Sequence, residues 1–154
     1  MKAAQFRICP ESGLQFHKSA ETLIRANAVL AVIALLVGGV TALLITLTRW
    51  PTVHLLPADK FYQLLTTHGI NMLIFWIIFF EIAVLYFCSS TLLRCRLATP
   101  RLAWLAFALM VIGAITNNIA VYQGASSVMM TSYVPMMAAP SFYLGLILFA
   151  VGAL

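Results

Sequence analysis

Three long stretches of the chain contain almost no charged residue, and this feature limits the possible folds more than any other. They cover residues 26–48, 61–93 and 102–122, and the only charged side chain among them is Glu81. A helix needs about 20 apolar residues to cross the roughly 30 Å hydrocarbon layer of a membrane. Each stretch is long enough, so the sequence predicts three transmembrane helices.

A fourth apolar run, residues 141–154, is shorter than a full span and carries no cap or terminal charge cluster. We expect it to be the start of a fourth helix. Barrel strands would alternate apolar and polar residues, whereas these runs are continuously apolar. Backbone groups in lipid must also bond internally. The predicted fold is all-α: one polytopic transmembrane helix bundle over residues 1–154, with three complete spans and the start of a fourth.

Composition excludes other classes of protein. Hydrophobic residues make up 63% of the chain and charged residues 8%, against about 45–50% and about 25% in soluble domains. A water-soluble enzyme and a disordered chain are both excluded. The net charge of +5 comes from scattered residues that form no basic face, so no nucleic-acid partner is expected. The lipid bilayer is the expected environment.

The basic residues predict the orientation. Seven lie on one side of the predicted spans and two on the other, and basic loops face the cytoplasm. We therefore expect a multi-pass protein of the inner (cytoplasmic) membrane with a cytoplasmic N-terminus. The seven are Lys2, Arg7, Lys18, Arg25, Arg94, Arg96 and Arg101, and the two are Arg49 and Lys60.

His68 lies inside the second predicted span, at a depth near the outer surface. Neutral imidazole is a good ligand for haem iron and copper, and ionisable residues inside spans indicate functional sites. The predicted helix face around His68 is aromatic and aliphatic, with Asn71 as its one amide, and Gly69 leaves space for a planar group. Two interpretations stay open: His68 ligates a haem or metal, or it hydrogen-bonds to a neighbouring helix.

Other polar residues inside the spans suggest weaker hypotheses. Glu81 either takes part in proton relay or bonds to a helix outside this chain. Thr116, Asn117 and Asn118 lie at a depth comparable to His68. They either hydrogen-bond between helices or support a cofactor from its surroundings. In an isolated chain we expect Glu81, Asn117 and Asn118 to face lipid without partners.

A pair of glycines and two pairs of methionines indicate further features of the fold and of possible sites. Gly38 and Gly39 predict a point where two helices pack closely. The pairs Met129–Met130 and Met136–Met137 flank the predicted outer loop. Thioethers suit Cu(I), but apolar filling of an interface is the more common use of methionine.

The segment FYQLLTTHGINMLIFW resembles the start of the second helix of haem-copper oxidase subunit I. The matching positions are Tyr62, Gln63, Leu65, Thr66, His68 and Gly69, and more loosely Asn71 through Trp76. TSYVPMMAAPSFYLG, residues 131–145, is similar to the segment that enters the fourth helix in B-type oxidases. The loop RCRLATPR lacks the Asn and Asp that start a proton path in A-type members. The resemblance therefore favours a B-type cytochrome oxidase or a more distant member.

The resemblance implies that the chain is the N-terminal portion of a respiratory terminal oxidase's catalytic subunit. His68 would be an axial ligand of a low-spin haem that passes electrons toward dioxygen, coupled to proton translocation. The haem-copper centre is expected only in a missing C-terminal part. The implied partners are the remaining helices of subunit I and a copper-bearing or electron-donating second subunit.

Two alternatives to this function stay open: a nitric oxide reductase-type subunit, and a truncated accessory or assembly membrane protein that is not an enzyme. By itself the chain is not expected to catalyse oxygen reduction. Its one predicted membrane-embedded histidine, His68, can hold only one face of one haem.

Overall fold

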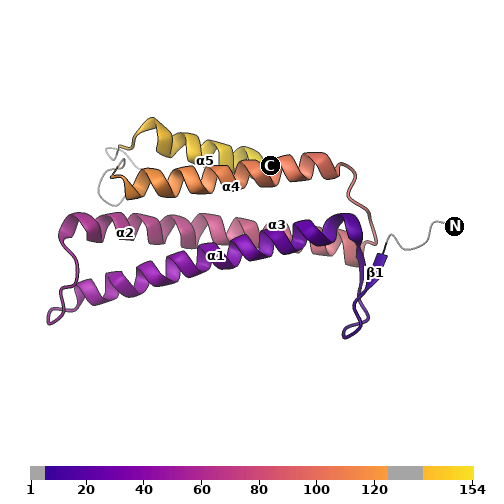
Figure 1. Cartoon of the computed structure of the whole chain (residues 1–154), viewed down its shortest axis with the longest axis horizontal. Coiled ribbons are helices and arrows are strands. Elements are labelled where there is room, and N and C mark those ends of the chain that lie inside the picture. The colour runs from indigo at the N-terminus through magenta and orange to yellow at the C-terminus, as the bar shows by residue number, and fades with distance from the viewer. Residues whose placement is uncertain (1–5, 125–136) are drawn as a thin grey trace.

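The computed structural model describes residues 6–124 and 137–154, and in them the chain forms a helical bundle preceded by a short β-hairpin (Figure 1). Two segments of the second long helix have π-helical hydrogen bonding and carry the labels η1 and η2. In chain order the elements are β1 (Phe6–Ile8), β2 (Gln15–His17), α1 (Lys18–Arg49), α2 (Ala58–Ile70), η1 (Asn71–Phe75), α3 (Trp76–Phe87), η2 (Cys88–Leu92), α4 (Pro100–Tyr122) and α5 (Pro140–Ala153).

The structure confirms three helices long and apolar enough to cross a membrane. They are Lys18–Arg49, the continuous helix Ala58–Leu92, and Pro100–Tyr122, while Pro140–Ala153 is a shorter apolar helix. The first helix begins well before the predicted residue 26. His17 explains this early start, because its imidazole Nδ1 accepts a hydrogen bond from the backbone N–H of Ser19 at 3.2 Å and caps the helix.

The helices run back and forth past one another (Figure 1). α1 and the α2–α3 helix are antiparallel neighbours, and α4 and α5 form a second antiparallel pair. The β-hairpin, η2 and the α3–α4 connection meet at one end of the bundle, which we call the hairpin end. The α1–α2 connection and the start of α5 lie at the opposite end. This arrangement keeps His68 on α2 away from the hairpin end.

The N-terminal hairpin was not predicted from the sequence. Phe6 pairs with His17 and Ile8 with Gln15 in an antiparallel register, and Phe16 packs against Phe87 with ring centroids 5.8 Å apart. Because Phe87 is the last residue of α3, the hairpin contacts the end of the second long helix.

The turn of the hairpin contains Cys9. A hydrogen bond from the Ser12 side chain is the main cause that lowers the pKa of Cys9 to about 7.

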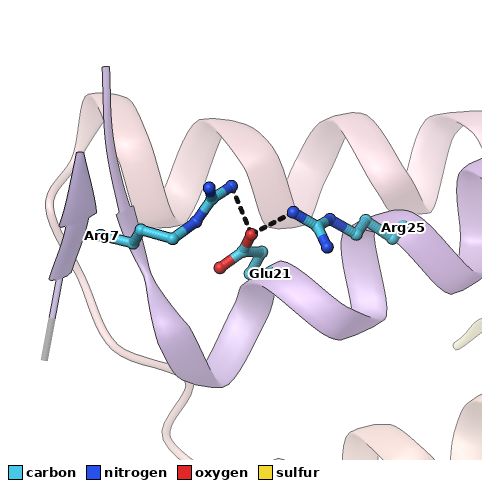
Figure 2. A network of polar contacts seen from close by, with 3 residues as sticks. All are labelled: Arg7, Glu21 and Arg25. Atoms are coloured by element: carbon cyan, nitrogen blue, oxygen red, sulfur yellow. Dashed lines mark hydrogen bonds and ion pairs between the residues drawn. The ribbon is translucent and has the colours of Figure 1, made fainter. Parts of the chain in front are cut away.

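A shared carboxylate fixes the hairpin to α1 (Figure 2). Glu21 in the first turn of α1 forms ion pairs with Arg7 on β1 and with Arg25 one helical turn further on. In each pair an arginine Nη2 lies 2.5 Å from Glu21 Oε1. The Glu21 side chain is only 16% exposed, so water screens these pairs less than it would at an open surface. The acidic group also lies at the positive N-terminal end of the helix dipole.

Three glycines let α4 and α5 approach within backbone contact. A Cβ at Gly113 would lie 2.5 Å from the Phe149 nitrogen, and one at Gly145 would lie 2.8 Å from the Asn117 nitrogen. At Gly152 it would lie 2.5 Å from the Ala106 carbonyl oxygen. No side chain fits at such distances. Small residues at the contact are the usual way for membrane helices to associate, because lipid supplies no hydrophobic driving force between them.

Phenylalanine side chains join this helix pair to the second long helix. Phe149 of α5 is 2% exposed and packs on Phe75 and Phe79, with ring centroids 4.7 and 5.4 Å away. The second ring lies nearly perpendicular to Phe149, which is a favourable aromatic geometry. The buried core therefore runs from η1 and α3 to α5.

We predict that Gly113→Ala destabilises the bundle by about 1–3 kcal/mol, the usual effect of overpacking. The new methyl group would meet backbone atoms of α5, which cannot move without separating the helices. Unfolding in detergent with increasing dodecyl sulfate measures the change. Gly39→Ala is the matched control, because a Cβ there meets nothing within 4 Å. Equal stability of the two variants would contradict the close-contact interpretation.

Candidate functional site

His68 lies near the end of α2, half-buried, and its imidazole is held by the neighbouring helix. Its Nδ1 is 2.8 Å from the backbone carbonyl oxygen of Gly38 in α1. A carbonyl can only accept, so the imidazole donates from Nδ1. Nε2 then carries the free lone pair, and it has no hydrogen-bond partner among residues 6–124 and 137–154. The predicted hydrogen bond to a neighbouring helix is thus present, and it leaves Nε2 able to bind a metal.

Gly38 contributes both its carbonyl and its lack of a side chain. A Cβ at this position would overlap the sulfur of Met72, one helical turn beyond His68. The same carbonyl oxygen also accepts a hydrogen bond from the Thr41 hydroxyl at 2.9 Å. The predicted close packing is confirmed at Gly38. At Gly39 a Cβ would meet nothing within 4 Å in the described parts of the chain, because successive residues of a helix point about 100° apart and Gly39 does not face Met72.

The helix changes its hydrogen bonding directly after the His68 turn. From Asn71 to Phe75 it is π-helical, and the Trp76 backbone N–H donates to the Asn71 carbonyl, five residues earlier. Single π-helical turns inside α-helices are frequent at functional sites. Asn71 is 3% exposed, and its amide nitrogen donates to the Asn118 side-chain oxygen on α4 at 2.7 Å. His68 therefore bonds to α1, while Asn71 three residues later bonds to α4.

Asn117 and Thr116, the other two polar residues considered on α4, differ in how deeply they are buried. Asn117 is fully buried and its amide donates to the Phe142 carbonyl of α5 at 3.0 Å, while its side-chain oxygen has no partner in the described parts of the chain. Thr116 is half-buried. The expectation that Asn117 and Asn118 face lipid without partners is wrong, because α5 and η1 of this chain supply partners.

Glu81 lies on α3 and is exposed. Within residues 6–124 and 137–154 it makes no ion pair or side-chain hydrogen bond. It is the only carboxylate inside the apolar stretches. The expected bond to a helix outside this chain stays a prediction, and the position of Glu81 on the outside of this bundle agrees with it.

The set of donors around His68 fits a cofactor better than a bare metal ion. Over the described residues no group of three or more His, Cys, Asp or Glu side chains could hold a metal ion. A haem brings its own four equatorial nitrogens and needs from one side a single imidazole. At Gly69, beside His68, a Cβ would meet nothing within 4 Å. The backbone beside His68 is therefore open among the described residues, and the space for a planar group there stays a prediction.

Two features of the site differ in how far the sequence indicates them. The role of the Gly38 carbonyl was missed because a backbone acceptor leaves no trace in sequence. The Asn71–Asn118 pair had a usable signal, since amides are rare in apolar spans. Met129, Met130 and Met136 lie outside the described residues, and Met137 is 74% exposed. The copper hypothesis for the methionines therefore stays untested.

A comparison with protein families identifies the chain's relationship. The sequence model of the family described as "Cytochrome C and Quinol oxidase polypeptide I" matches residues 22–154, which include all the helices α2 to α5 and most of α1. No curated protein and no solved structure matches the chain.

We predict that Asn71→Leu destabilises the bundle by about 1–2 kcal/mol, since it leaves the half-buried Asn118 oxygen without its donor. Asn71→Leu combined with Asn118→Leu should recover part of the loss, because neither amide is then left unpaired. Detergent unfolding of the four proteins in this double-mutant cycle measures the coupling. Thr116→Val on the same helix is the control and should change stability little. Simple additivity of the two asparagine variants would show that the pair contributes nothing.

Proposed function

The chain belongs to the family of cytochrome c and quinol oxidase polypeptide I, and we propose on that basis that it forms the N-terminal part of a respiratory terminal oxidase's catalytic subunit, with His68 as an axial ligand of a low-spin haem. The family is one of haem-copper oxidase-type enzymes, normally binds haem and copper, and works within complexes that contain other subunits. The three long apolar helices make this a multi-pass membrane protein. The proposed reaction of the complete enzyme is reduction of dioxygen to water, coupled to proton translocation.

The hydrogen bond between His68 Nδ1 and the Gly38 carbonyl is the observation that supports the haem-ligand proposal most directly. Metal-binding histidines usually donate their second ring nitrogen to a carbonyl or carboxylate, which fixes the tautomer and the ring orientation. Here α1 provides that acceptor. Because the bond comes from a helix backbone, the imidazole is oriented before any cofactor binds, and Nε2 is the nitrogen that would hold the iron.

The residues of this chain have limited roles in the proposed chemistry. A low-spin haem supplies one-electron transfer when it is bound. The Gly38 carbonyl keeps the His68 imidazole in one orientation through its hydrogen bond to Nδ1, and the Thr41 hydroxyl bonds to the same carbonyl. Phe75 in η1 is buried and makes its surroundings apolar, and solvent exposure is one determinant of haem potential.

The copper centre and the second axial ligand would come from helices that follow this segment in subunit I. Exposed Glu81 on α3 is the polar residue that those helices would cover. A copper-bearing or electron-donating second subunit completes the proposed complex. We also propose that the hairpin end faces the cytoplasm in the inner membrane, because Arg7, Lys18 and the arginines of the α3–α4 connection gather there.

His68→Ala in the complete complex should remove or convert the low-spin haem spectrum while the protein stays in the membrane. His68→Met should keep a haem with a raised reduction potential, because methionine ligation raises it. Visible spectra of membranes with a redox titration provide the measurement. His54→Ala, in the exposed α1–α2 connection, is the control and should leave the spectrum as it is. An unchanged low-spin spectrum in the His68→Ala variant would leave only the packing role of this histidine.

Native cysteines at the hairpin end allow the orientation to be tested. Cys95 is exposed in the α3–α4 connection and Cys9 lies in the hairpin turn. With its pKa lowered to about 7, Cys9 is increasingly thiolate, and therefore more reactive, as pH rises through that value. A membrane-impermeant maleimide should label both only from the cytoplasmic side. It should label a Leu55→Cys variant only from the other side. The reverse pattern would overturn the proposed orientation.

A further inference from the structure

A cavity lies at the end of the bundle opposite the hairpin, and His68 is not among its lining residues. Its volume is about 250 Å³, and the last turn of α1, the α1–α2 connection and the first turn of α2 line it. Pockets for drug-sized ligands usually measure about 300–1,000 Å³, so this one suits a smaller group. Arg49, His54 and Tyr62 contribute hydrogen-bonding side chains, and so does Thr48, whose hydroxyl donates to the Leu44 carbonyl.

Arg49 brings a positive charge that no carboxylate balances. Its guanidinium carbon lies 5.9 Å from the centre of the Phe61 ring, in a cation–π contact. Asp59 is the only acidic residue in the sequence near this end, and no ion pair joins the two in the described parts of the chain. The ring holds the guanidinium over the cavity wall and leaves its N–H edge free to pair with an anion.

His54 enters the cavity from a strained backbone. Its φ angle is +41°, in the left-handed region that residues other than glycine rarely adopt. Such strain concentrates at active sites and ligand clamps. The first turn of α2, which also carries Asp59, borders the cavity. Its N-cap residue Pro57 makes no side-chain cap hydrogen bond, and Ala58 at its start lines the cavity, so backbone N–H groups and the positive end of the helix dipole lie nearby.

The depth of the cavity indicates what kind of anion it meets. Arg49 ends the first span and the α1–α2 connection follows it. Trp50 is 57% exposed and Tyr62 is 36% exposed, as expected of aromatic residues at a membrane–water boundary. At this level the most abundant anionic groups are the phosphates of lipid headgroups. Arginine pairs with phosphate through two parallel hydrogen bonds.

We propose that this cavity binds the phosphodiester of a membrane lipid, with Arg49 as the charged contact and His54 and Tyr62 as neighbouring hydrogen-bond donors. The acyl chains of the lipid would lie along α1, which exposes the apolar side chains of Leu43 and Leu47. The proposal does not depend on His68 or on which leaflet this end occupies.

Native mass spectrometry of the complete detergent-solubilised complex tests the proposal, with phosphatidylglycerol as the probe. Arg49→Gln should weaken retention of this lipid about tenfold, and Tyr62→Phe should weaken it less. Lys60→Gln is the matched control. It removes one positive charge at the same end, from a side chain that bonds to Gln63 and does not line the cavity. Diacylglycerol, which lacks the phosphate, should bind equally to all four proteins.

Three outcomes would overturn the proposal. One is unchanged retention of phosphatidylglycerol in Arg49→Gln, and another is an equal loss in Lys60→Gln, which would indicate a nonspecific charge effect. The third is loss of haem absorbance from Arg49→Gln with lipid retention intact, which would assign the cavity to a haem carboxylate. If Arg49→Gln does not assemble, Tyr62→Phe replaces it, because this change removes one hydroxyl only. Weaker retention of phosphatidylglycerol in Tyr62→Phe than in Lys60→Gln would then support the proposal, and equal retention would overturn it.

Discussion

Hydrocarbon offers no hydrogen-bonding partner, and this constraint governs every polar group inside the three spans. An unpaired polar group there costs several kcal/mol, so most of these groups bond within this chain, and the Asn117 side-chain oxygen and Glu81 are exceptions among the described residues. The helix backbones satisfy themselves, so the few polar side chains decide which helices lie together. His68 bonds to α1 through Gly38, Asn71 to α4 through Asn118, and Asn117 to α5 through Phe142. These three contacts link the second helix to its neighbours on two sides and join the last two helices.

The sequence predicted the helices well because their signal is local. Long uncharged runs can be recognised without knowing what packs against them, and the three spans differ from prediction by a few residues at most ends. The largest difference is at the start of α1. There a histidine cap and the carboxylate of Glu21 extend the helix into polar sequence. The hairpin was missed because strands of three residues carry too little pattern to recognise.

The site was only partly predictable, and the reason is the range of the interactions. His68 stood out as a histidine in an apolar run, so its candidacy followed from composition and resemblance. What orients it is a backbone oxygen 30 positions away, and backbone acceptors are the same in every residue. Glycine spacing signalled close packing, but only the structure distinguishes Gly38, which meets Met72, from Gly39, which meets nothing. The sequence thus identified His68 as the ligand candidate, but not the Gly38 carbonyl that orients its imidazole.

The π-helical turns imply how this span responds to changes in chain length. A π turn accommodates one residue more than an α turn, so η1 holds a residue that a regular helix would not need. Removing one residue between 71 and 75 would let the helix close into α geometry while the segments on both sides keep their facing. The same deletion in α3, which is regular, would rotate one side by about 100° and turn Phe79 out of the core. Length variation among related chains should therefore collect at η1 and η2, and alignments that place gaps elsewhere in this helix would misassign the residues beyond them.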